Sequence, residues 1–121
     1  MIKANELRIG NIINVINRAP VVVTADHIKS ISEGDKDYSP ISLTPEWLER
    51  CGFKQKPPEP DDLPQWQNLN MNIAQYTDGF YLYTITSDPW HDQAVGNKIE
   101  YVHTLQNISL DLFGEELKIE L

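Results

Sequence analysis

The sequence has few of the features that reveal a function directly. One cysteine, Cys51, stands among 121 residues, so an intramolecular disulfide is excluded and an oxidising compartment is not implied. The six glycines form no phosphate-binding loop, and the HExxH, CxxC and GxSxG signatures are also missing. We therefore expect no cofactor.

Long apolar runs are equally scarce. The longest, at residues 20–25, is far shorter than the about 20 residues that a membrane-spanning helix needs. The first residues contain no apolar stretch of signal-peptide length. These features predict a cytoplasmic protein with no membrane partner.

Positive charge is in short supply. Ten Lys and Arg residues face 18 Asp and Glu residues, for a net charge of −8, which disfavours a nucleic-acid partner bound through phosphates. The first 32 residues are an exception, with four basic side chains against two acidic ones: Lys3, Arg8, Arg18 and Lys29. This excess of positive charge either marks a basic face, which would suit a nucleic-acid accessory protein, or arises by chance.

Length and composition favour one folded domain, 1–121. Hydrophobic residues make up 40% of the chain, and a chain of this size can bury one core without metal or disulfides. β-branched runs at residues 12–16, 21–25 and 27–31 predict a meander of three strands. We expect an α+β fold with an antiparallel, curled sheet, whose start is similar to SH3-like small barrels.

Two helices are predicted beside the sheet. The first, short one covers residues 44–53, because Thr44 fits an N-cap, Pro45 the first helical position and Gly52 the helix end. The second, longer one runs near residues 103–113 and is stopped by Gly114. Residues 98–102 and 117–121 are predicted to be strands.

A long hairpin is predicted between these helices. Residues 66–77 and 80–86 form its arms, and Asp78-Gly79 is expected to be a two-residue type I′ turn. Alternation places Leu69, Met71 and Ile73 on a core face with Phe80 and Leu82. The other face carries aromatic side chains that predict either a contact surface or packing under a helix, with Trp66 nearby: Tyr76, Tyr81 and Tyr83.

The remaining candidates for chemistry are weak. Asp88, His91 and Asp92 lie in one loop and could bind a divalent cation or perform acid–base catalysis, although a polar loop held by a buried Trp90 explains them too. Cys51 at a helix C-terminus is expected to be a buried, inert thiol. For His103 we expect a structural role.

Three stretches together resemble a known family. They are Lys3-Ala4-Asn5-Glu6-Leu7-Arg8-Ile9-Gly10-Asn11, then Pro40-Ile41-Ser42-Leu43-Thr44-Pro45-Glu46-Trp47-Leu48, and Tyr101-Val102-His103-Thr104-Leu105-Gln106-Asn107. In this order they resemble a family of small uncharacterised proteins of Bacteroidetes and their phages and mobile elements. The resemblance implies a compact accessory protein of phage or mobile-element origin, and carries no catalytic residue onto this chain.

The leading hypothesis is accordingly a noncatalytic protein-interaction protein, whose partner is another protein. It depends on the aromatic sheet face, on the acidic surface and on the absence of a coherent catalytic set. One alternative is an enzyme that uses the loop with Asp88, His91 and Asp92. The other is a nucleic-acid accessory protein that uses the basic N-terminal third. The oligomeric state is left open.

Overall fold

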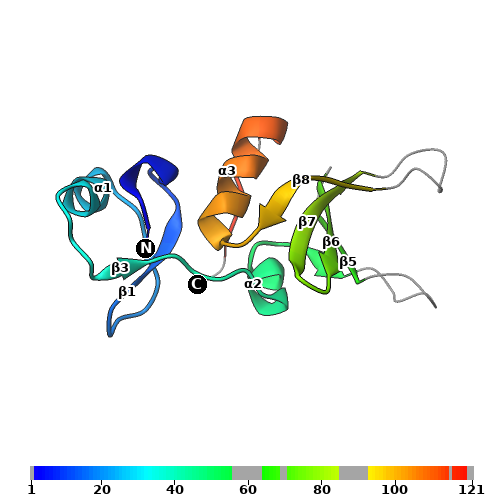
Figure 1. Ribbon diagram of the computed structural model, residues 1–121, viewed down its shortest axis with the longest axis horizontal. Helices are drawn as coiled ribbons and strands as arrows, with labels where there is room; N and C mark the ends of the chain where they lie inside the picture. Colours follow the sequence, from blue (N-terminus) through cyan, green and yellow to red (C-terminus); the bar gives the residue numbers. More distant parts are fainter. Residues whose placement is uncertain (1, 56–63, 69–70, 85–92, 115, 120–121) are drawn as a thin grey trace. The chain divides into compact units, whose positions relative to one another are not determined.

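The fold is α+β, as predicted, with two open antiparallel sheets and three α-helices in the described part of the chain (Figure 1). A computed structural model describes residues 2–55, 64–68, 71–84, 93–114 and 116–119. Two compact units contain them. The first unit combines Met1–Ser42 with Tyr101–Glu116, and the second combines Leu43–Glu100 with Leu117–Glu120. Whether they fold as the single predicted domain, 1–121, stays a prediction.

The first unit contains a small sheet and two helices. Its strands β1 (Ile12–Val15), β2 (Val21–Val22) and β3 (Tyr38–Ser39) lie in the order β2-β1-β3, and a 3-10 turn, η1 (Ala4–Glu6), precedes them. The helices are α1 (Ala25–Ser32) and α3 (Val102–Phe113). Five buried aliphatic side chains form the core of this unit. They come from the segment before β1, from β1, from the residue after β2 and from α1: Ile2, Leu7, Ile13, Val23 and Ile31.

Residues 27–31 form part of α1, so the predicted third strand is wrong. Thr24 caps this helix, and its backbone N–H donates to the His27 Nδ1 atom at 3.0 Å. Ile28 packs against the core of the first unit and Ile31 is buried in it. Their spacing of three residues, which breaks a strand pattern, places both side chains on one face of a helix.

Helix α3 confirms the predicted C-terminal helix. Gly114 ends it in the left-handed conformation at φ 66°, and its N–H donates to the Leu110 carbonyl. The predicted edge strand at 117–121 is wrong where the structure describes it, because residues 117–119 have no strand partner. Of the strand predicted at 98–102, only Lys98 and Ile99 lie in a strand, which begins at Gln93, and Val102 is already the first residue of α3.

The second unit is built around a five-stranded sheet. Helix α2 (Pro45–Arg50) begins as predicted, with the Thr44 hydroxyl accepting from the Trp47 N–H at 3.3 Å. The strands follow in the order β4-β5-β6-β7-β8. They are β4 (Lys54–Gln55), β5 (Gln65–Asn68), β6 (Met71–Tyr76), β7 (Gly79–Thr84) and β8 (Gln93–Ile99). No helix in the described residues is long and apolar enough to cross a membrane.

The β6–β7 hairpin turns one residue earlier than predicted. Tyr76 pairs with Gly79, so Thr77 and Asp78 form the loop instead of Asp78 and Gly79. Positive φ falls on Gly79 alone, at 146°, whereas a type I′ turn requires it at both loop residues. Because the pairing is displaced by two residues, the described side chains of residues 71–76 and 80–82 keep their predicted faces.

Gly79 is the residue of this hairpin that tolerates a side chain least. A Cβ added there would lie 2.6 Å from Cδ and 3.0 Å from Cγ of Lys98. We expect Gly79→Ala to lower the free energy of unfolding by about 1–3 kcal/mol, from backbone strain together with displacement of the Lys98 chain. Urea denaturation measures this loss, and Lys98→Ala in the same background should recover part of it. No recovery would mean that backbone strain alone is responsible.

One face of this sheet is the core, as alternation predicts. Five buried side chains lie on it: Trp66, Met71, Ile73, Phe80 and Leu82. Leu69, also predicted there, lies outside the described residues. Tyr76 and Tyr81 lie on the opposite face.

Candidate functional site

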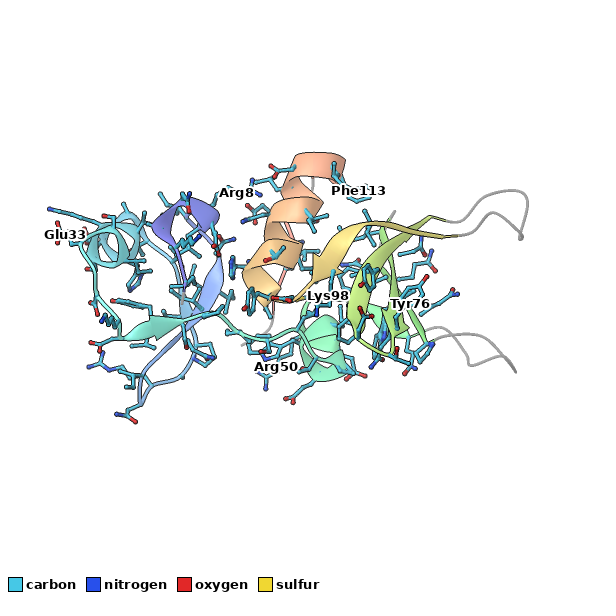
Figure 2. The ribbon with its side chains drawn as sticks, in the orientation of Figure 1. Arg8, Glu33, Arg50, Tyr76, Lys98 and Phe113 are labelled. Carbon is cyan, nitrogen blue, oxygen red and sulfur yellow. The ribbon has the colours of Figure 1, made fainter. Side chains whose placement is uncertain are left out.

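Two tyrosines meet at the end of the β6–β7 hairpin. The rings of Tyr76 and Tyr81 are packed edge to face, with centroids 5.1 Å apart and planes at 84°. Both side chains are half-buried, and Thr77 and Asp78 between the strands are exposed. Figure 2 shows Tyr76 among the side chains of this sheet. The three residues Tyr76, Asp78 and Tyr81 are called the tyrosine end below.

A hydrogen bond inside the tyrosine end fixes one ring. The Tyr81 hydroxyl donates to Asp78 Oδ2 at 2.8 Å. This bond, together with the negative charge of the carboxylate, raises the pKa of Tyr81 above its usual value. The phenol therefore remains protonated at neutral pH, and the ring is held in a defined orientation over the hairpin.

The charges around the tyrosine end do not cancel. Lys98, whose stem crosses Gly79, pairs with Glu100 at 3.4 Å. Asp78 has the neutral Tyr81 hydroxyl as its partner and no ion pair with any described residue. Among the described residues, the Asp78 carboxylate therefore has no cation as a partner, and it lies beside two aromatic rings.

The other two predicted contact residues, Tyr83 and Trp66, are not part of the Tyr76–Tyr81 pair. Tyr83 lies in β7 opposite Asn72 of β6, two residues beyond Tyr81. Trp66 pairs with Ile73 and is only 2% exposed, on the core face of the sheet. The structure thus brings Tyr76 and Tyr81 together and places Trp66 on the other side, where it is a packing residue.

The predicted metal loop is outside the described residues. Asp88, His91 and Asp92, and Trp90 with them, fall within 85–92. Among the residues that are described, no group of three His, Cys, Asp or Glu side chains could hold a metal ion. Cys51 is fully buried at the C-terminal end of α2, and burial raises its pKa to about 12. A thiol with that pKa is not a nucleophile at neutral pH.

Sequence reasoning missed a cluster of side-chain amides in the first unit. Gln106 of α3 accepts from the Ile12 N–H at 2.8 Å and donates to the Gly10 carbonyl at 3.0 Å. In a parallel sheet, one residue of a strand bonds the carbonyl and the N–H of two residues in the neighbouring strand that lie two positions apart, and Gly10 and Ile12 have this spacing. The Gln106 amide therefore replaces a strand beside β1, at a point that the two-residue β3 does not reach.

Asn107 extends the same connection. Its Oδ1 accepts from Asn11 Nδ2 at 2.9 Å and from Arg8 Nε at 3.0 Å, while its Nδ2 donates to the Glu6 carbonyl at 2.8 Å. Arg8 also pairs with Asp111 at 3.1 Å. The first and third stretches of the family resemblance therefore meet in the fold. Of the four basic N-terminal residues, Arg8 is already neutralised within the chain.

His103 is buried beside the same amide cluster. It is 1% exposed, its ring stacks on Tyr101 at 5.6 Å, and its Nε2 lies 3.5 Å from Glu6 Oε2. Nδ1 is buried, and no described residue is its hydrogen-bond partner. Burial lowers the pKa of His103, and the Glu6 carboxylate offsets only part of that effect. The arrangement fits the structural role expected from the sequence.

The lowered pKa of His103 predicts a pH dependence of stability. As the pH falls, His103 binds a proton in the unfolded chain before it does so in the folded chain. Its contribution to the free energy of unfolding is therefore fully present above about pH 6.5 and declines as the pH falls below that value. Urea denaturation between about pH 7 and pH 5 measures this decline. His103→Gln should reduce its slope, and Glu6→Gln should steepen it. An unchanged slope in His103→Gln would contradict the assignment.

Comparison with protein-family models, with curated proteins and with solved structures gives no match for this chain.

Proposed function

We propose that this chain is a noncatalytic accessory protein that binds another protein through the tyrosine end. The observation that carries the proposal is the edge-to-face pair of Tyr76 and Tyr81, half-buried and held by the bond from Tyr81 to Asp78. An origin in a phage or mobile element, which the family resemblance implies, is part of the same proposal.

The physical support comes from what such a pair gains on binding. Tyrosine buries a large apolar area, loses few rotamers and keeps a hydroxyl for hydrogen bonding, so it is enriched among residues that dominate protein interfaces. Here the ring orientations are fixed before binding, which lowers the entropy cost of association. A rigid pair beside an exposed turn suits a protein partner better than a small molecule, which requires an enclosing pocket.

Site-specific photo-crosslinking tests the proposal. We would incorporate benzoylphenylalanine at Tyr76 in one variant and at Glu33 in another, irradiate native cells, and identify adducts by mass spectrometry. Glu33 follows α1 in the first unit and is exposed (Figure 2). The proposal expects one recurrent protein adduct from position 76 and none of that mass from position 33.

A second pair of variants separates contact from stability. Tyr76→Ser removes a ring of the tyrosine end, and Tyr38→Ser removes a half-buried tyrosine of the first unit. Capture of the same partner should fall about tenfold or more with Tyr76→Ser, the usual loss at a central aromatic contact, and stay unchanged with Tyr38→Ser. Equal capture by both variants would overturn the proposal.

A further inference from the structure

We propose that the tyrosine end recognises an arginine side chain in a basic segment of its partner, with the guanidinium stacked on a tyrosine ring and paired with Asp78. The inference deepens the proposed function and rests on it. Three features of the second unit support it: the two rings, the free carboxylate and the charge balance around them.

The carboxylate is positioned to accept a cation. Asp78 is exposed, and the Tyr81 hydroxyl donates to Oδ2, so Oδ1 can accept from a further donor, since no described residue bonds it. Lys98, whose stem lies beside Gly79, is already paired with Glu100. An incoming cation therefore meets a carboxylate that no described cation compensates.

The rings favour the same kind of ligand. The face of a tyrosine ring attracts a cation electrostatically, and a planar guanidinium can stack on the ring while its N–H groups reach a carboxylate. The chain already shows this contact on α2, where the Arg50 guanidinium lies 4.9 Å from the centre of the Trp47 ring. Lysine, a compact and strongly hydrated point charge, cannot make both contacts as well.

The charge of the whole unit acts in the same direction. Leu43–Glu100 and Leu117–Glu120 contain ten acidic and five basic residues. A basic segment would therefore be attracted to this unit before any specific contact forms, and that attraction weakens with salt. The specific part of the recognition must then remain when salt is raised.

Peptide titration followed by amide NMR shifts tests the inference. The probes are acetylated peptides of alternating glycine with arginine, with lysine or with glutamate, added to the full chain at about 0.15 M salt. We expect shifts at Tyr76, Asp78 and Tyr81 with the arginine peptide. The lysine peptide should bind about threefold or more weakly, and the glutamate peptide should cause no shifts.

Variants locate the contact. Asp78→Asn should weaken binding of the arginine peptide about fivefold or more, because a charge-assisted pair is lost. Glu33→Gln removes the same charge from an exposed position of the first unit and should change binding less than about twofold. Tyr81→Phe keeps the ring and the carboxylate but removes the bond that holds them in place, so it should weaken binding less than Asp78→Asn does.

The outcomes distinguish this inference from the proposed function. Equal weakening by Asp78→Asn and Glu33→Gln, or equal binding of the arginine and lysine peptides, would reduce the effect to net charge and overturn the inference. The crosslink from position 76 could still form in that case, and the proposed function would stand with a partner of different chemistry. Loss of that crosslink would remove both.

Discussion

Replacing Gln106 by Leu is expected to lower the free energy of unfolding by about 2–4 kcal/mol. The side chain is 5% exposed, and its amide bonds the Ile12 N–H and the Gly10 carbonyl. Leucine has a similar size, so the loss is not one of volume. It arises because the buried Ile12 N–H and the half-buried Gly10 carbonyl lose their partner.

Urea denaturation followed by far-UV circular dichroism measures this loss. The control is Gln67→Leu, the same replacement at an exposed position of β5, which should change stability by less than about 0.5 kcal/mol. A loss below about 1 kcal/mol for Gln106→Leu would mean that water or a shifted backbone satisfies β1 as well as the amide does. The role assigned to Gln106 would then be wrong.

The elements that the sequence predicted correctly are those with local signals. Helix α2 has its N-cap at Thr44, its first-turn proline and Gly52 within nine residues, so neighbouring residues determine both ends. Helix α1 also has local signals, at Thr24, Ile28 and Ile31. It was predicted as a strand because its isoleucines are β-branched, and β-branched residues favour strands. The contact of Gln106 with Ile12 spans 94 positions, and nothing near either residue announces it.

The tyrosine face could be predicted because alternation survives an error of two residues in register. Met71, Ile73, Phe80 and Leu82 are buried together, as expected, and Tyr76 packs on Tyr81. The position of Trp66 could not be predicted, because the pattern of residues 66–77 is that of one continuous strand. In one strand Trp66 and Tyr76 would share a face.

The structure instead divides this stretch into β5 and β6. They pair antiparallel with Trp66 opposite Ile73, which moves the indole to the core face. The bond from Tyr81 to Asp78 depends on a loop one residue earlier than the Asp-Gly pattern indicates. The faces of this sheet thus follow from alternation, whereas the contacts at its end depend on where each turn falls.

The position of Trp66 leads to the second large effect. Trp66→Ala is expected to lower the free energy of unfolding by about 3–5 kcal/mol, because a large side chain is removed from a closed core. Trp66→Phe should cost only about 1–2 kcal/mol, since the buried indole Nε1 has no hydrogen-bond partner among the described residues. Urea denaturation of both variants measures the difference. If Trp66→Ala captured less of the protein partner while its free energy of unfolding stayed unchanged, Trp66 would be a contact residue after all.

Gln106→Leu and Trp66→Ala together also test whether residues 1–121 fold as one domain. Gln106 belongs to the first compact unit and Trp66 to the second. If the chain unfolds in one cooperative transition, each variant should reduce the hydrogen-exchange protection of core amides in both units by the same free energy. If the units unfold separately, Gln106→Leu should affect Ile13 and Val23 but not Ile73, and Trp66→Ala the reverse. Since a domain of this size has about 5–15 kcal/mol of stability in total, losses of this size are large enough to separate the two outcomes.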